Sequence, residues 1–182
     1  MMLDGQLLVA TPRLTDPNFR RTVVLILNHD DDGALGVVIN RPSTLEVFEV
    51  LPSWAHAVAM PQQVFGGGPV GRDSALAVAV ALGDGPSAGF QRLAGTYGLV
   101  DLDALPEQIV PDLVGLRVFS GYAGWGEGQL EMEIDEGSWY VVSALASDVL
   151  SSEPETLWRD VLRRQPGELA YVASFPDDPT KN

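Results

Sequence analysis

The sequence predicts a single domain of the α+β class. Short runs of β-branched and apolar residues recur between turn residues, as in strands, whereas helical periodicity is confined to a few segments. A length of 182 residues, with 46% hydrophobic and 20% charged residues, suits one globular domain with a sizeable core. No internal repeat or Ser/Gly linker divides the chain. We therefore expect one domain over residues 1–182, with a short flexible tail from about residue 176.

The first part of the chain predicts strands joined by turns. Gln6–Ala10 and Thr22–Leu27 are apolar and β-branched enough to be strands. Between them, Asp16-Pro17 combines a capping side chain with a proline, which suits one short helical turn. His29–Gly33 predicts a turn and Gly36–Asn40 a strand, so a hairpin is expected there.

The middle of the chain predicts one helix and several strands. Thr44 could cap a helix to Leu51, because Leu45, Phe48 and Leu51 would share one face. Gly83–Gly95 has the composition of a loop. Further strands are expected at Val64-Phe65, Ser74–Leu82, Tyr97–Val100, Leu116–Ser120 and Ser138–Ala144.

Helices are expected mainly towards the C-terminus. Asp103–Val110 suits a short helix capped by Asp103, since a proline is tolerated in the first turn. Gln129–Ile134 fits either a strand or a helix by its pattern. Ser152–Glu155 matches a capping box. The apolar stripe that follows, to about Arg164, consists of Leu157, Trp158, Val161 and Leu162.

Composition and charge exclude several function classes. The absence of cysteine excludes disulfides, thiolate nucleophiles and Cys-ligated metal centres. The longest apolar run, Ala75–Leu82, is far short of the roughly 20 residues that cross a bilayer. The first residues carry no basic segment of the kind that opens a secretory signal, so we expect a cytoplasmic protein without a membrane partner. A net charge of −14 disfavours direct nucleic-acid binding, because that binding depends on basic contacts to phosphate.

Three short patterns imitate known sites without their context. The glycines at 66, 68 and 71 fit a dinucleotide fingerprint, but strand-like rather than helical sequence follows, so no cofactor is predicted. Gly85–Gly89 fits a nucleophile elbow, but both histidines precede its serine. Asn28–Gly33 imitates the start of a calcium loop, yet Ile39 occupies the position of the closing glutamate, and we predict no metal site there.

The densest candidate for a binding site is the segment from Phe119 to Ile134. Four glycines surround Tyr122 and Trp125, which could stack on a planar ligand or fill a core, and we expect the aromatic-glycine part, Gly121–Gly126, to be a loop. Arg41 lies between Asn40 and a proline, where it could bind an anion or tie down a turn. The predicted ligand- or partner-binding surface comprises Asn40, Arg41, Gly67, Pro69, Tyr122 and Trp125, with the Gly-Gly-Gly-Pro turn as one wall.

An enzyme remains the alternative hypothesis. His29 could act as a general base in a hydrolase or transferase, and the neighbouring acids could bind a metal ion that assists the reaction. No nucleophile, base and orienting group can be assembled around it from the sequence, so no catalytic residue is assigned. Burial of His29 away from any cleft would leave this hypothesis without a site.

Several motifs, in this order, resemble the YqgE/AlgH family of bacterial proteins. They are Ala10-Thr11-Pro12, Asp16–Arg21, Asn40-Arg41-Pro42, Gly66–Val70 and Gly121–Gly126. The resemblance implies an α+β fold with a coiled, branched mixed β-sheet and flanking helices, and it favours a helix at Gln129–Ile134. It also implies a cytosolic protein, of a family sometimes labelled transcriptional regulators, without an agreed catalytic residue.

Two departures from the family pattern bear on function. Asn28 stands where relatives commonly have a glutamate before the first histidine, and the segment from Arg72 to Val78 lacks a histidine that relatives often carry. Chemistry built on those groups is therefore not expected here. We expect a binding or regulatory protein that acts through a protein partner or a small ligand, with direct DNA binding as the least favoured alternative.

Overall fold

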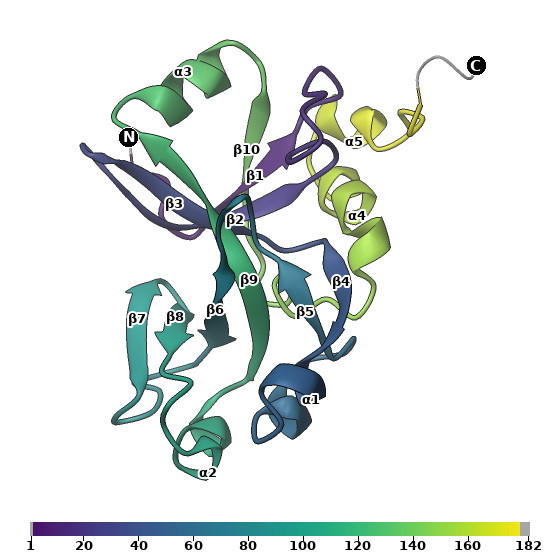
Figure 1. The fold of residues 1–182 in the computed structure, drawn as a ribbon. Helices are drawn as coiled ribbons and strands as arrows, with labels where there is room; N and C mark the ends of the chain where they lie inside the picture. The colour runs from purple at the N-terminus through teal and green to yellow at the C-terminus, as the bar shows by residue number, and fades with distance from the viewer. Residues whose placement is uncertain (1, 179–182) are drawn as a thin grey trace.

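One long strand, β9 at Gly115–Gly126, joins the two halves of the β-sheet in the computed structural model, which describes residues 2–178 (Figure 1). Its first half pairs antiparallel with β6 (Val70–Val80) and parallel with β5 (Gln63–Gly66). Its second half pairs antiparallel with β3 (Gly33–Val38). The sheet therefore branches at β9, as the resemblance implied.

The first half of the sheet has the order β10-β1-β2-β3-β9 and is antiparallel throughout. It adds β1 (Gln6–Ala10), β2 (Val23–Asp30) and β10 (Trp139–Ser143). The first five residues of β2 are all apolar and buried, and three of them are β-branched. The predictions of strands in this half are confirmed, with ends shifted by a few residues.

The second half continues from β9 through β6 and β8 to β7, and β5 carries β4 on its other side. These additional strands are β4 (Pro42–Glu46), β7 (Phe90–Ala94) and β8 (Tyr97–Val100). β7 lies in the stretch predicted to be a loop. It forms because residues of β8 supply its partners, as in the pair Phe90 and Val100, and such pairing is not visible in local composition.

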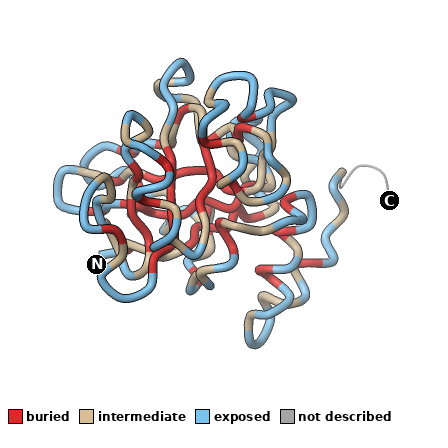
Figure 2. The backbone as a smooth tube through the Cα atoms, turned by 90° about the horizontal axis from the view of Figure 1, so that it is seen from below, coloured by how far each residue is buried: buried red, intermediate tan, exposed pale blue. Residues whose placement is uncertain are grey.

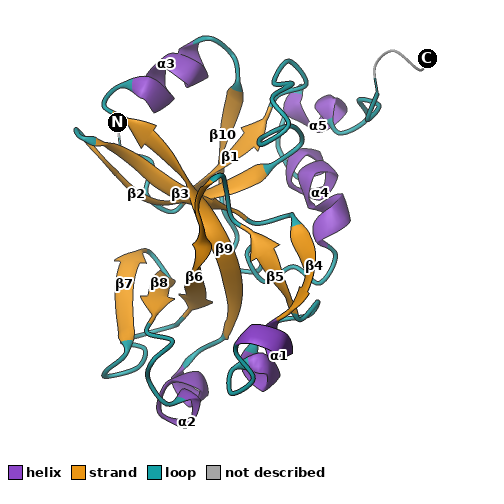
Figure 3. Cartoon of the chain, in the orientation of Figure 1, coloured by secondary structure: helices purple, strands orange, loops and turns teal. Residues whose placement is uncertain are grey.

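The helices are short and lie around the sheet (Figure 3). They are α1 (Val47–Val50), α2 (Pro106–Ile109), α3 (Gln129–Asp135), α4 (Leu157–Arg163) and α5 (Leu169–Val172). The prediction of a helix at Gln129–Ile134 is confirmed. None of the described helices is both long and apolar enough to span a membrane.

The predicted helix Thr44–Leu51 is wrong in its first half. The hydroxyl of Ser43 donates to the carbonyl of Val64, and β4 pairs with β5, so this segment is held as a strand up to Glu46. Only the four residues from Val47 are helical. The expected apolar face is not buried either, since Phe48 is 67% exposed.

Two predicted helix caps do not form. α2 begins at Pro106 after Leu105, rather than at Asp103. The capping box at Ser152 is replaced by a 3-10 turn at Pro154–Thr156, and α4 follows without a side-chain cap. The aromatic-glycine segment also differs from its prediction, because it forms the second half of β9 instead of a loop.

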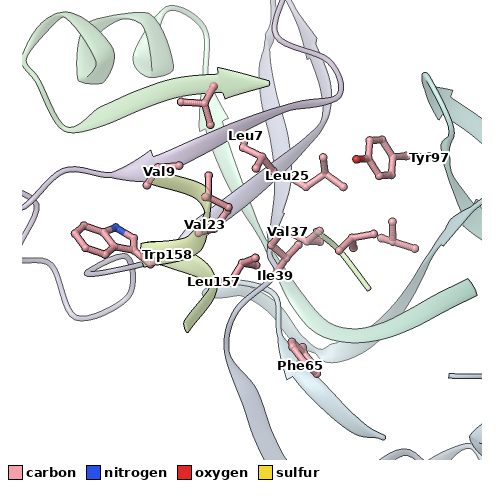
Figure 4. Packing of buried hydrophobic residues seen from close by; sticks show 14 of the residues in the cluster. Leu7, Val9, Val23, Leu25, Val37, Ile39, Phe65, Tyr97, Leu157 and Trp158 are labelled. Carbon is pink, nitrogen blue, oxygen red and sulfur yellow. The ribbon is translucent and has the colours of Figure 1, made fainter. Parts of the chain in front are cut away.

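Three apolar clusters fill the molecule, and buried backbone runs through its centre (Figure 2). The largest joins residues of both halves of the sheet to α4, and Trp158 packs in it with Val9 and Val23 (Figure 4). Trp139 and the stripe on α4 are buried as predicted. At the C-terminal end, Asp177 pairs with Arg159 at 3.0 Å; the rest of the predicted tail, residues 179–182, lies outside the described residues.

Candidate functional site

A pocket of about 270 Å³ opens where the turn after Asp16 meets the second half of the sheet. We call it the arginine pocket, because two guanidinium groups contribute to its wall. It is lined by Asn18, Val38, Arg41, Gly66, Gly68, Pro69, Arg72 and Ser120.

The glycine turn, Gly66–Pro69, forms one wall of this pocket because its backbone packs directly against the backbone of β9. The Gly67 amide donates to the Ser120 carbonyl at 2.8 Å, and the Val38 amide donates to the Gly67 carbonyl at 2.9 Å. A Cβ atom on Gly67 would lie 2.3 Å from the Gly121 carbonyl oxygen, so no larger residue fits there without displacing backbone. This close packing fixes Gly66 and Pro69 at the pocket.

Arg41 ties the opposite wall together. Its two terminal nitrogens donate to the carbonyl oxygens of Asn18 and Arg20, each at 2.7 Å, which is the turn-stabilising role considered from the sequence. Burial lowers the pKa of Arg41, and Asp16 opposes that shift. A guanidinium has five N–H donors and stays charged in proteins, so Arg41 retains donors for an anion.

Arg72 completes the basic side of the pocket. It is exposed, and among the described residues its guanidinium donates to the Asn18 side-chain oxygen at a long 3.4 Å. The ion pairs found between residues 2–178 use other arginines, namely Arg21, Arg159, Arg163 and Arg164. Arg41 and Arg72 are absent from these ion pairs. Two cations without a carboxylate partner in this set therefore line one pocket of a strongly acidic chain.

The other predicted site residues have structural contacts of their own. Asn40 accepts from the Val23 amide at 3.0 Å and donates to the Arg21 carbonyl at 2.9 Å, so it fastens two segments. Tyr122 is partly buried, and its ring lies where a Cβ on Gly71 would be 3.3 Å away. Trp125 is 6% exposed in the cluster beneath α3.

Of the six predicted residues, the structure brings Arg41 and Pro69 into the arginine pocket, with Gly67 supporting its wall. Trp125 is not one of the residues that line it. Asn18, Arg72 and Ser120 were missed. The turn expected at Asp16-Pro17 was a usable signal for Asn18, whereas nothing local indicated that Arg72 and Ser120 would face it.

His29 lies inside β2 rather than in the predicted turn, and it is 2% exposed. Its Nδ1 accepts from the Leu3 amide at 3.2 Å, and its Nε2 lies 2.7 Å from a carboxylate oxygen of Glu131. The Glu131 backbone amide and His29 together hold the pKa of that carboxyl low. Both ring nitrogens have partners, and His29 is not among the residues that line the arginine pocket.

Metal ligands do not gather around His29. Across the described part of the chain, no group of three or more His, Asp or Glu side chains could hold a metal ion. The acids at Asp30, Asp31 and Asp32 instead form the hairpin tip, where an Asp30 oxygen accepts from the Asp32 amide at 2.9 Å.

Comparison with known proteins identifies relatives over nearly the whole chain. A family profile described as AlgH-like matches residues 7–170. A UPF0301 protein of Streptomyces coelicolor is 56% identical, over 99% of this chain and 95% of its own length. A UPF0301 protein of Thermobifida fusca is 50% identical, over 100% of this chain and 96% of its own length.

Solved structures of relatives have the same fold. The crystal structure of a Corynebacterium diphtheriae protein superposes with a TM-score of 0.89 at 38% identity, covering 95% of this chain and 92% of that one. The solution structure of the AlgH protein from Pseudomonas aeruginosa gives a TM-score of 0.71 at 27% identity, covering 97% and 95%. The chain therefore belongs to the AlgH-like family of UPF0301 proteins, in agreement with the resemblance found in its sequence.

Proposed function

We propose that this protein is a cytoplasmic binding protein with a regulatory role, which recognises an anionic group of a protein partner or small ligand in the arginine pocket. The observation that carries the proposal is that Arg41 and Arg72 line the same pocket. Neither takes part in the ion pairs between arginine and carboxylate groups of the described residues, which use other arginines. Guanidinium groups match carboxylate and phosphate geometry, which makes such a group the natural occupant.

The surroundings strengthen selectivity for a single anionic group. The chain carries a net charge of −14, so its surface as a whole repels anions, and the arginine pocket is a local exception. Asn18 and Ser120 add polar atoms at its edge. A few charge-assisted hydrogen bonds, each contributing roughly 1.5–3 kcal/mol before the costs of binding, support weak, millimolar affinity for a small isolated anion.

The proposal can be tested by nuclear magnetic resonance titration. Sodium acetate and sodium phosphate are added separately to isotopically labelled protein at constant ionic strength set with chloride. We expect saturable shifts of the Gly66 and Gly68 amides and of the Arg41 and Arg72 side-chain N–H signals.

Two variants with the same charge change separate the site from general electrostatics. Arg72→Gln removes an exposed pocket cation and should abolish the saturable shifts. Arg163→Gln removes a 65% exposed cation that pairs with Asp160 on α4, and should leave them intact. Shifts that never saturate, or that are equal in the two variants, would refute anion binding at this pocket.

A further inference from the structure

A second, apolar groove adjoins the arginine pocket. Its volume is about 260 Å³, and it shares Arg72 and Ser120 with that pocket. The two cavities therefore adjoin at these residues, and we call them together the composite groove. The remaining lining of the second part is Leu45, Val50, Leu51, Val64, Asp73, Ser74, Ala75 and Val118.

The groove lies where β5 and β6 pair with β9. β5 and β6 lie on opposite sides of β9, and α1 follows β4 at one end (Figure 3). The pairing of β6 with β9 is interrupted between Val70 and Ala75. The Ser120 hydroxyl donates to the carbonyl of Arg72 within that interruption, which holds this irregular segment as a wall.

Apolar side chains along this groove are exposed to an unusual degree. Leu45 is 38% exposed and Val50 49%, whereas Phe48, 67% exposed, lines a separate cavity with Met60 and Pro61. Leu45 and Val50 come from β4 and α1, in the segment that the sequence had predicted to be a single helix. Clustered exposed apolar residues next to a polar rim are typical of surfaces that bind a partner.

The charges are arranged with a polarity along the same surface. Arg41 lies in the arginine pocket and Arg72 at its junction with the apolar part. Asp73 lies in the apolar part, and Glu46 and Glu49 flank the exposed residues of β4 and α1. A matching occupant has one anionic group, apolar side chains next to it, and neutral or basic groups beyond. A second acidic group would meet these carboxylates.

We infer that the composite groove binds the C-terminal end of a partner polypeptide. Its terminal carboxylate lies against Arg41 and Arg72, and its last apolar side chain lies among Leu45, Val50 and Val64. The Asn18 turn and the Gly66–Pro69 turn bound the arginine end, which suits a chain that stops there. The arginine pocket of about 270 Å³ and the adjoining apolar groove of about 260 Å³ together hold more than a small anion, which favours a polypeptide end. This inference rests on the proposed anion-binding function and specifies its ligand.

The test uses an array of random hexapeptides with free C-terminal carboxylates and a second array with the same sequences amidated. We expect wild-type protein to select peptides with apolar C-terminal residues and basic residues upstream. Amidation of a selected peptide, or Arg72→Gln, should weaken binding at least tenfold, because each removes one side of a charge pair.

A matched pair of Val→Ser variants tests the apolar part. Val50→Ser should weaken the same peptides severalfold, whereas Val114→Ser, at a 58% exposed valine outside the groove lining, should leave them unchanged. Both sites are exposed, so folding is expected to be unaffected. Selection that ignores amidation, or equal effects of the two variants, would overturn the inference.

Sodium octanoate is the final probe. Saturable octanoate binding that depends on Arg72 and Val50, without any selected peptide, would assign the groove to a small amphipathic carboxylate and reject a polypeptide end. Acetate binding without peptide selection or octanoate binding would reject this inference while leaving the proposed function intact. Failure of acetate, phosphate and peptides alike would reject both.

Discussion

The indole rings of Trp125 and Trp139 meet edge to face, with centroids 6.2 Å apart and planes inclined at 78°. The Nε1–H of each ring donates to the same carboxylate oxygen of Glu133, both at 2.9 Å. Gln129 donates to the second oxygen at 3.0 Å. One carboxylate on α3 therefore joins the ends of β9 and β10, and it supplies the polar partner that buried indoles require.

Replacing this carboxylate should destabilise the protein. We expect Glu133→Ala to lower the free energy of unfolding by about 2–4 kcal/mol, because it leaves two buried indole donors unpaired. Glu133→Gln keeps an acceptor oxygen and should cost less than half as much. Urea unfolding followed by tryptophan fluorescence measures both. Glu127→Ala, at an exposed position, should stay within about 0.5 kcal/mol of wild type, and a similar value for Glu133→Ala would contradict this account.

The close packing of the glycine turn against β9 makes a second prediction. Gly121 has a φ of +74°, and a Cβ there would lie 2.5 Å from the Gly68 carbonyl oxygen. Gly121→Ala should therefore cost at least about 2 kcal/mol, from backbone strain and displaced backbone together. Gly83 has a φ of +61° with nothing within 4 Å of its built Cβ. Gly83→Ala isolates the strain alone and should cost about 1 kcal/mol; equal losses would rule out the steric contribution.

The sequence predicted those strands and helices whose conformation is determined by the residue types within the segment itself. β1 and β8 have the predicted bounds, because their β-branched and aromatic residues suffice to indicate a strand. β4 and β7 were missed because pairing decides their conformation: β4 pairs with β5, well separated in sequence, and β7 pairs with the adjacent β8. The branching at β9 has no local signal at all, and it entered the sequence analysis only through the family resemblance.

The candidate site was predictable only in part for a similar reason. Arg41 and Pro69 stand in recognisable turns, and both reach the pocket. Trp125 and Tyr122 attracted attention as aromatics among glycines, yet Trp125 is buried against Phe19 and Trp139. Arg72 joins Arg41 because β6 departs from regular pairing between Val70 and Ala75. That irregularity depends on the meeting of β6 with β9, which no short segment specifies.

Tyr97 should make stability depend on alkaline pH. It is 5% exposed and its hydroxyl donates to the Leu145 carbonyl at 3.0 Å. Burial, with a further contribution from Asp148, raises the pKa of Tyr97 to about 12 from 10.0. The folded state thus holds the proton more tightly than the unfolded state, so this stability is complete below pH 10 and is lost as pH rises to about 12.

The comparison of wild type with Tyr97→Phe measures that effect. Near neutral pH the variant should be less stable by about 1 kcal/mol, through loss of the hydrogen bond. As pH rises through the window, wild type should lose about 2–3 kcal/mol relative to the variant, so their order reverses. Arg117 has the opposite effect on stability as pH rises, because burial lowers its pKa to about 10. Both wild type and Tyr97→Phe contain Arg117, so its contribution cancels when their stabilities are subtracted. Tyr171→Phe, at a 78% exposed tyrosine, should produce no reversal.

Trp158 should be one of the largest single contributors to stability. It is 3% exposed, its Nε1–H donates to the Ala10 carbonyl at 2.9 Å, and the Arg21 guanidinium lies 3.9 Å from its ring centroid. Trp158→Ala should cost roughly 3–5 kcal/mol, since it creates a cavity and orphans a buried carbonyl. Chemical denaturation with an unchanged midpoint would show that α4 does not support the core, whereas Tyr171→Ala should leave that midpoint nearly unchanged.

Direct binding to duplex DNA is not expected. The chain has two pairs of adjacent arginines, Arg20-Arg21 and Arg163-Arg164, and three of these four side chains have partners within the protein. Both terminal nitrogens of Arg164 donate to Asp148 at 2.6 Å, and Arg163 pairs with Asp160 at 3.6 Å. Arg21, in the other basic pair, donates to the Phe175 carbonyl at 2.8 Å. A total of 11 basic residues against 25 acids leaves little cationic surface for phosphate.

A mobility-shift titration at about 150 mM salt tests this expectation, because that ionic strength screens weak nonspecific attraction. We expect no retention of duplex DNA by wild-type protein at micromolar concentration, so that any regulatory effect is exerted through a protein partner. The Arg72→Gln variant is informative here as well. Submicromolar, sequence-selective retention that this variant weakens would mean that the arginine pocket contacts DNA phosphate, and the charge argument would then fail.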